Sequence, residues 1–154
     1  MALRIKPSQQ DKTGQALNWT VFALACLGVL DATYLLIYKL SGNNNMCLGN
    51  GGCHDVNFSS YSEIGGIPVS VYGLFAFLAI AAIHLVEPRY KIVKENGSLA
   101  IFGISLAGVA FSVYLTWLEI YVIHAICPFC VASAVIITLI FILALIRLIK
   151  QPAP

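Results

Sequence analysis

The run from Ala125 to Cys130, with the letters AICPFC, places two cysteines three residues apart at the start of a long apolar segment. Two cysteines at this spacing can close a small disulfide ring and open it again. At a helix N-terminus the first sulfur lies near unpaired backbone N–H groups, which favour its thiolate. Pro128 suits the first turn of such a helix, because the N–H that proline lacks would have no partner there. The motif therefore predicts a redox-active pair where a helix begins.

Two further cysteines, Cys47 and Cys53, lie six residues apart in a stretch rich in Asn and Gly. This stretch, residues 39–67, is predicted to be a long loop with a short interfacial helix around residues 56–63. The fifth cysteine, Cys26, falls inside an apolar run, where packing explains a small side chain. We therefore expect four of the five cysteines to take part in disulfide chemistry.

The composition indicates which solvent surrounds the chain. Of 154 residues, 59% are hydrophobic and only 10% are charged, whereas a soluble domain has about 25% charged residues. Too few charges are present to cover a water-soluble domain of this length. The chain is therefore predicted to be a single-domain membrane protein, with no nucleic-acid partner.

Four apolar segments are long enough to cross a bilayer, which takes about 20 residues in a helix. We expect an all-α integral membrane fold, a bundle of four transmembrane helices with the long loop between the first two. The polar residues 1–18 are predicted to be a cytoplasmic tail, followed by a single membrane domain over 19–150. No small-residue cleavage site follows the first apolar run, so a cleaved signal peptide is not expected. The predicted transmembrane segments are residues 19–38, 68–86, 97–123 and 128–149.

The distribution of Lys and Arg predicts the orientation. Placing both termini and the connector at residues 87–96 in the cytoplasm puts eight of the nine cations there and leaves only Lys39 outside. The long loop and the turn before Cys127 then share the other side. We expect a multi-pass protein of the bacterial inner membrane, with its cysteines at the periplasmic face. That compartment is oxidising and permits disulfide chemistry.

Other interpretations of the four cysteines stay open on the residues alone. Cys47 and Cys53 could form a structural disulfide beside an inert Cys-x-x-Cys pair. Four cysteines could also bind zinc. A spacing of six residues in the loop and a hydrophobic Pro-Phe spacer at a membrane interface make a closed metal site a poor fit, and no metal is expected.

The order and spacing of several motifs resemble the vitamin K epoxide reductase family, in particular its bacterial stand-alone branch. The resemblance covers about residues 17–149. It implies a four-helix bundle enclosing a quinone, with Cys127 and Cys130 as the active-site pair and Cys47 and Cys53 as a relay pair. Ser59 matches the loop serine that helps to bind or position the quinone or the loop helix. The motifs are a first helix, a loop with two cysteines, Cys53-x-x-Val56-x-x-Ser59, the run from Gly66 to Gly73 (GIPVSVYG) and the run AICPFC.

The resemblance also implies an activity. Thiol–disulfide exchange passes electrons one sulfur at a time, so a reduced thioredoxin-like (DsbA-like) thiol oxidase would attack Cys53 and free Cys47 to attack Cys127. Cys130 would then face ubiquinone, menaquinone or phylloquinone as the electron acceptor. The protein is thus expected to be a thiol:quinone oxidoreductase that supports disulfide bond formation.

Some positions depart from the animal members of the family. Ser133 and Ala134 follow Cys130 where those enzymes have Thr-Tyr-Ala, and Val69 stands where they have Asn. Vitamin K epoxide is therefore not the expected substrate. No thioredoxin domain follows residue 150, so the thiol partner is expected to be a separate protein.

Several residues inside or beside the spans are secondary candidates. Asp31 and Glu119 are ionisable groups in apolar segments, where such groups are functional by default. They are candidates for proton delivery to the quinone, with a structural hydrogen bond or a loop anchor as the alternative. Phe75 and Phe111 are candidates to line the quinone pocket, although lipid contact explains them equally well. Tyr38 is interpreted as an interfacial anchor.

A different class of function competes with the enzyme. A non-catalytic membrane module or assembly factor, stapled by disulfides, would need its cysteines for stability only. A DsbB-type oxidase has similar chemistry, but its Cys-x-x-Cys lies in the first periplasmic loop, whereas here the motif opens the fourth helix.

Overall fold

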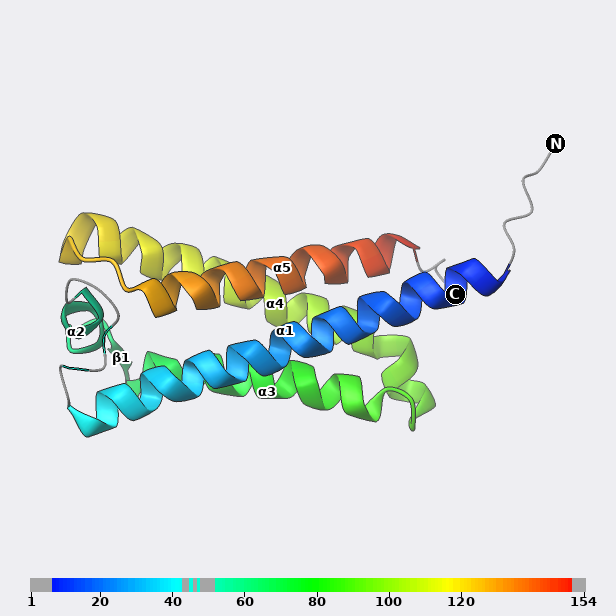
Figure 1. Ribbon diagram of the computed structural model, residues 1–154, viewed down its shortest axis with the longest axis horizontal. Coiled ribbons are helices and arrows are strands. Elements are labelled where there is room, and N and C mark those ends of the chain that lie inside the picture. Colours follow the sequence, from blue (N-terminus) through cyan, green and yellow to red (C-terminus); the bar gives the residue numbers. More distant parts are fainter. Residues whose placement is uncertain (1–6, 43–44, 46, 48–51, 151–154) are drawn as a thin grey trace.

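Four long helices lie side by side and form a bundle in the computed structural model, which describes residues 7–42, 45, 47 and 52–150 (Figure 1). Each contains a segment long and apolar enough to cross a membrane. The prediction of an all-α, multi-pass membrane fold is therefore confirmed. The four helices are α1 (Pro7–Ser41), α3 (Val69–Val86), α4 (Lys91–Leu118) and α5 (Pro128–Lys150).

Two of these helices begin earlier than hydropathy indicates. α1 begins at Pro7, so residues 7–18, predicted as a tail, are helical, and α4 begins at Lys91 rather than at residue 97. Both extensions are polar, and hydropathy registers only the apolar part of a helix. Proline is also well suited to a first helical turn. The helices therefore extend beyond the segments that can lie in the bilayer.

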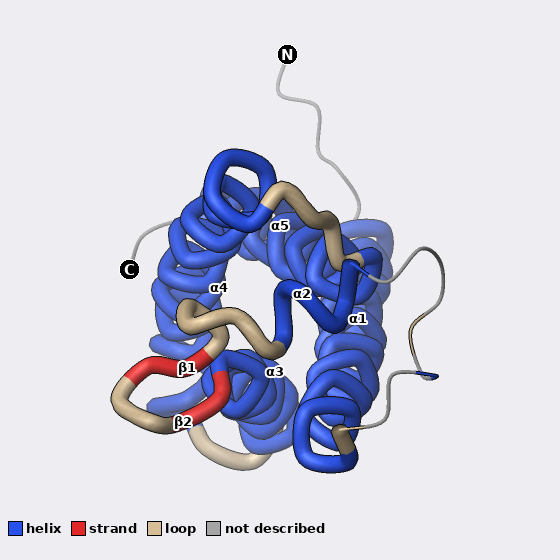
Figure 2. The backbone as a smooth tube through the Cα atoms, turned by 90° about the vertical axis from the view of Figure 1, so that its left-hand side faces the viewer, coloured by secondary structure: helices blue, strands red, loops and turns tan. Residues whose placement is uncertain are grey.

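Short elements cover one end of the bundle, as Figure 2 shows: α2 (Gly52–Asn57), β1 (Glu63–Ile64) and β2 (Ile67–Pro68). The two strands pair antiparallel, and the hairpin turns at Gly65 and Gly66, whose φ angles of 62° and 80° favour glycine. A helix does form in the predicted loop, but it covers residues 52–57 rather than 56–63. Serine hydroxyls after Asn57 donate to backbone carbonyls three residues back, which favours turns over further helix.

Small residues allow the helices to approach closely. The ring of Phe77 in α3 occupies the space that a Cβ at Gly28 in α1 would need. A Cβ at Gly108 in α4 would lie 2.7 Å from Cγ1 of Ile137 in α5. Close contact of this kind is how helices associate in lipid, where the hydrophobic effect offers little between them. Among adjacent pairs of the four long helices, α3 and α4 pack least extensively, and the cavity described below lies along that seam.

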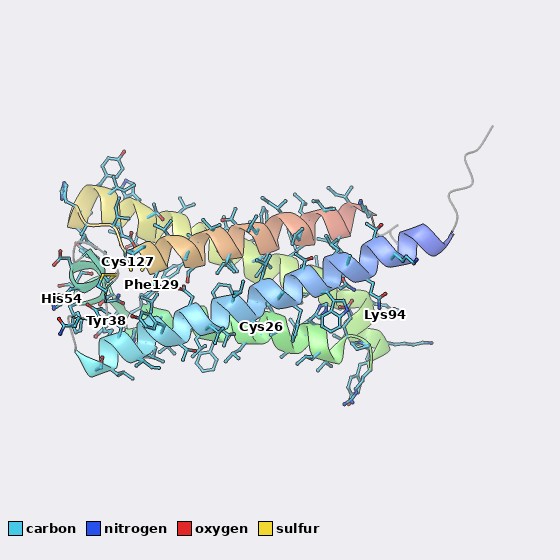
Figure 3. All side chains as sticks on the ribbon, viewed as in Figure 1. Cys26, Tyr38, His54, Lys94, Cys127 and Phe129 are labelled. Atoms are coloured by element: carbon cyan, nitrogen blue, oxygen red, sulfur yellow. A yellow bond between two sulfur atoms is a disulfide. The ribbon has the colours of Figure 1, made fainter. Side chains whose placement is uncertain are left out.

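The end opposite α2 is fastened by a buried ion pair. Arg147 of α5 donates to Glu87, which directly follows α3 and is 7% exposed. Nδ1 of His84 lies 3.8 Å from the other carboxylate oxygen of Glu87. In Figure 3 the labels of His54, Tyr38, Cys127 and Phe129 gather at the α2 end, far from that of Lys94. One end of the bundle thus carries the two cysteine pairs, and the opposite end is stabilised by the ion pair of Glu87 with Arg147.

Candidate active site

The Cys-x-x-Cys pair is positioned by a wide turn at the end of α4. The helix continues as a π-helical turn, η2 (Glu119–Ile123), and ends at His124 in a left-handed conformation with φ of 57°. The chain then reverses, and α5 begins at Pro128. Wide turns of this type often mark functional sites. Here the turn brings the side chain of Glu119 back over the motif, where its Oε2 accepts the backbone N–H of Cys127 at 3.3 Å.

Cys127 and Cys130 lie as two free cysteines that interact through their side chains. Cys127 is completely buried, whereas Cys130 is only partly so. The hydrogen bond from the Cys130 side chain is the largest influence on the Cys127 thiol and lowers its pKa, outweighing burial, which acts in the opposite direction. Cys127 is therefore the sulfur whose thiolate is better stabilised before it enters disulfide exchange.

The second cysteine pair packs directly on the first. Cys47 and Cys53 form a disulfide with a Cα–Cα distance of 5.8 Å. Cys53, in α2, is 1% exposed and belongs to one buried cluster with Leu35, Tyr38 and Cys127, whereas Cys47 at its edge is half-buried. The structure thus brings together all four cysteines that the sequence singled out, from positions about 80 residues apart. Cys47, not Cys53, is the more exposed of the two loop cysteines.

Tyr38 belongs to the site, although the sequence indicated an interfacial anchor. Its side chain is 1% exposed, belongs to the buried cluster that contains Cys53 and Cys127, and lies edge-to-face against Phe58 at 6.2 Å between ring centroids. Its hydroxyl is buried and has no hydrogen-bond partner among the described residues. In a helix that is apolar on every side, the sequence gives no signal for which face turns inward, so this placement could not be found from it.

A cavity of about 540 Å³ lies next to Cys130, between α1, α3, α4 and α5. Its volume is within the range of pockets that bind small organic molecules. Most of its wall is apolar, with a minority of polar groups. The polar lining residues are Asn57, Ser59, Tyr61, Ser62, Ser70, Tyr72, Ser112, Thr116, Glu119, Cys130 and Ser133.

The predicted pocket residues fall on different sides of this wall. Ser59 and Phe111 line the cavity, and the Ser59 hydroxyl donates to the carbonyl of Val56. Phe75 is not among the lining residues and is 67% exposed on the outside of α3, so the expectation that it lines the pocket has to be corrected. Ser70, which the sequence did not single out, lines the cavity with a buried hydroxyl that has no partner among the described residues.

The two carboxylates in the spans have different access to the cavity. Glu119 lines it, is 4% exposed and also hydrogen bonds with the Cys130 side chain. Asp31 of α1 accepts a hydrogen bond from the hydroxyl of Ser133 in α5, and it is Ser133 that lines the cavity. Glu119 therefore contacts both the Cys130 thiol and the cavity. Asp31 reaches the cavity through Ser133.

Fold and site together define a four-span membrane protein with two cysteine pairs stacked over a ligand-sized cavity. The family model of the vitamin K epoxide reductase family matches residues 19–145. The chain belongs to this family. A curated relative, the thiol-disulfide oxidoreductase LTO1 of Arabidopsis thaliana, is 33% identical over 112 residues, which cover 69% of this chain and 30% of the relative. The chain thus matches less than a third of that relative's length.

Proposed function

We propose that this membrane protein is a thiol:quinone oxidoreductase that takes electrons from a thioredoxin-like protein and reduces a membrane quinone, thereby supporting disulfide bond formation. Family membership and the thiol-disulfide oxidoreductase relative support the thiol chemistry. The observation that carries the proposal is that the loop disulfide, the Cys127–Cys130 pair and the cavity are in contact in this order. The loop disulfide packs on Cys127, Cys127 interacts with Cys130, and Cys130 lines the cavity.

The cavity fits a quinone as the electron acceptor. A quinone ring is flat and apolar, and its two carbonyl oxygens need hydrogen-bond donors when they leave water. The wall is mostly apolar, and Ser70 offers a buried hydroxyl with no partner among the described residues. An unpartnered buried hydroxyl is costly unless a ligand completes its bonding. We assign Ser70 as a donor to a quinone oxygen, with Ser59 and Phe111 as further wall residues.

The burial of the loop sulfurs favours an order of transfer opposite to the one implied by the family resemblance. A partner thiolate must reach a sulfur in line, and Cys47 is half-buried whereas Cys53 is 1% exposed. The partner therefore attacks Cys47, and Cys53 is left as the thiolate next to Cys127. The difference in exposure between Cys47 and Cys53 supports this order.

Three exchange steps then carry two electrons inward. Cys53 attacks Cys127 of an oxidised active-site pair, so the Cys53–Cys127 bond forms, the Cys127–Cys130 bond breaks and Cys130 leaves as a thiolate. The second thiolate of the partner attacks its own sulfur in the mixed disulfide, so the partner–Cys47 bond breaks, the partner's disulfide closes and Cys47 leaves as a thiolate. Cys47 next attacks Cys53, so the Cys47–Cys53 bond forms, the Cys53–Cys127 bond breaks and Cys127 is released. The products are a closed Cys47–Cys53 disulfide and two free active-site cysteines, which is the state that the structure contains.

Quinone reduction reverses the state of the active-site pair. Cys127 and Cys130 give up two electrons and close their disulfide, and the quinone takes up two electrons and two protons. Glu119 contacts Cys130 and lines the cavity, so it is placed to accept the thiol proton and pass it on. Asp31 with Ser133 forms a second candidate proton path.

The proposed site of action follows from charge. The start of α1, the 87–90 connector and the end of α5 lie at the end that carries most of the Lys and Arg. We propose that this end is cytoplasmic and that the cysteines face the periplasm of a bacterial inner membrane. The electron donor there is a separate DsbA-like protein.

The test is quinone reduction by the purified full chain in detergent, with a reduced thioredoxin-like oxidase as the donor. Wild type is compared with Cys130→Ala, and Cys26→Ala serves as the matched control because Cys26 lies in α1 outside the site. We expect quinol formation in wild type and Cys26→Ala and none in folded Cys130→Ala. Folded wild type that is inactive with ubiquinone, menaquinone and phylloquinone would instead favour a disulfide-stapled, non-catalytic module.

A further inference from the structure

Lys39 is the one cation that the charge pattern leaves on the sulfur side of the membrane, and its side chain is only 10% exposed. It lies in the last turn of α1. Its ammonium group donates to the backbone carbonyl of Asn57 at 3.0 Å and to the hydroxyl of Ser62 at 2.6 Å. Oε1 of Glu63 lies 3.0 Å from the same nitrogen. An ammonium group has three donors, and each has an acceptor here.

These acceptors lie in the middle and at the C-terminal end of one piece of chain. We call residues 52–63 the relay segment, since α2 within it carries Cys53. Asn57 is the last residue of α2, and its side-chain amide donates to the carbonyl of Cys53 at 3.1 Å. Ser62 and Glu63 lead into the hairpin. A single group on α1 thus holds the helix that carries the sulfur and the start of the hairpin.

The contacts of Lys39 should contribute more free energy than a contact between exposed side chains, because its ammonium group is mostly buried. A mostly buried ammonium is tolerated only while its hydrogen bonds are satisfied. A cation is also favoured at a helix C-terminus, where the carbonyl of Asn57 carries the negative end of the α2 dipole. If the relay segment moved away, Lys39 would lose all three acceptors at once. The segment is therefore held as a unit.

The position of Lys39 links this anchor to the sulfurs. Its neighbour Tyr38 packs in the cluster that contains Cys53 and Cys127, so the end of α1 contacts the reacting groups with one residue and the relay segment with the next. We propose that Lys39 is a positioning residue that holds Cys53 against Cys127 for electron transfer, an inference that rests on the proposed exchange between these cysteines. Lys39 thereby raises the effective concentration of the Cys53 thiol at the Cys127 sulfur.

The test measures that effective concentration directly. In full-length protein with Cys26, Cys47 and Cys130 replaced by Ala, only Cys53 and Cys127 remain. Equilibration with glutathione and glutathione disulfide converts the two thiols to a Cys53–Cys127 disulfide and yields two glutathione thiols per bond. The bonded fraction, measured by mass spectrometry after acid quenching, gives the effective concentration. Lys39→Met is compared with Lys39→Arg and with Lys91→Met, a control cation at the opposite end of the bundle.

We expect Lys39→Met to lower the effective concentration about tenfold or more, as the loss of hydrogen bonds to a charged group predicts. Lys39→Arg should recover most of it, and Lys91→Met should match the parent. Ser62→Ala, which removes a single acceptor, gives an intermediate value and serves if Lys39→Met does not fold. Equal values for the parent, folded Lys39→Met and Ser62→Ala would overturn the proposal. No Cys53–Cys127 bond in the parent would instead overturn the exchange pathway itself.

Discussion

Replacing Glu119 with Gln separates the two roles that the structure gives this residue. The buried carboxylate accepts the Cys127 N–H at 3.3 Å and contacts the Cys130 side chain. Gln has the same size and still offers an oxygen to the N–H, so the turn before α5 should keep its shape. It cannot accept a proton from Cys130. The substitution therefore removes proton transfer and leaves the framework in place.

The expected magnitude follows from these contacts. A positioned general base contributes about 10²- to 10⁴-fold to the step that it assists, so Glu119→Gln should slow quinol formation at least about 100-fold. Its unfolding temperature should stay within a few degrees of wild type. Glu119→Ala, in contrast, also leaves the buried N–H of Cys127 without an acceptor, which costs about 1–3 kcal/mol. That variant should lose both rate and stability.

The assay is a single turnover followed anaerobically by stopped-flow absorbance, with fully reduced protein in detergent mixed with quinone. Asp31→Asn is the matched control, because Asp31 reaches the cavity only through Ser133; it should slow the reaction several-fold at most. If folded Glu119→Gln forms quinol at the wild-type rate, Glu119 is a structural acceptor and the assigned proton route is wrong.

Three further predictions follow from the same geometry. Ser70→Ala should raise the KM for quinone about two- to tenfold without lowering the unfolding temperature, since one neutral hydrogen bond contributes about 0.5–1.5 kcal/mol; an unchanged KM would remove Ser70 from the binding site. Cys130→Ala removes the group that most lowers the Cys127 pKa, so less thiolate should form at a given pH. Thiolate absorbance against pH, measured without Cys26, should shift to higher pH, and a shift to lower pH would contradict the assignment. Arg147→Met leaves Glu87 buried without its partner, which should cost about 3–5 kcal/mol in thermal or denaturant unfolding, while turnover of the folded fraction persists; an unchanged stability would show that the pair is not a fastening.

Much of the fold could be predicted because it depends on composition. Four apolar segments of sufficient length specify four spans, and the turn residues between them specify loops. The Cys-x-x-Cys pair at the start of an apolar helix predicts a redox site, because the helix N-terminus favours a thiolate. Pro128, which cannot donate a backbone hydrogen bond, indicates the first turn of α5 correctly.

What could not be predicted is which face of each helix turns inward. In α3 nearly every residue is apolar, so hydropathy has no period to follow, and Phe75 and Phe77 are equally plausible as pocket residues. The structure places Phe77 at the cavity and Phe75 outside. For the same reason, hydropathy could not predict that the side chain of Tyr38 in α1 turns toward the cysteines. The three acceptors of Lys39 depend on the path of the loop, which serine-to-backbone bonds determine and hydropathy does not register.

In the proposed reaction, electrons leave the Cys127–Cys130 pair for a quinone. The most direct measurement is the stoichiometry of one anaerobic turnover: reduced protein is mixed with excess quinone, quinol is quantified, and the disulfides formed are mapped by mass spectrometry. In a Cys47→Ala, Cys53→Ala variant, which has no loop pair, the account predicts one quinol for each Cys127–Cys130 disulfide. Quinol without loss of these two thiols, or no reaction in folded protein, would contradict it.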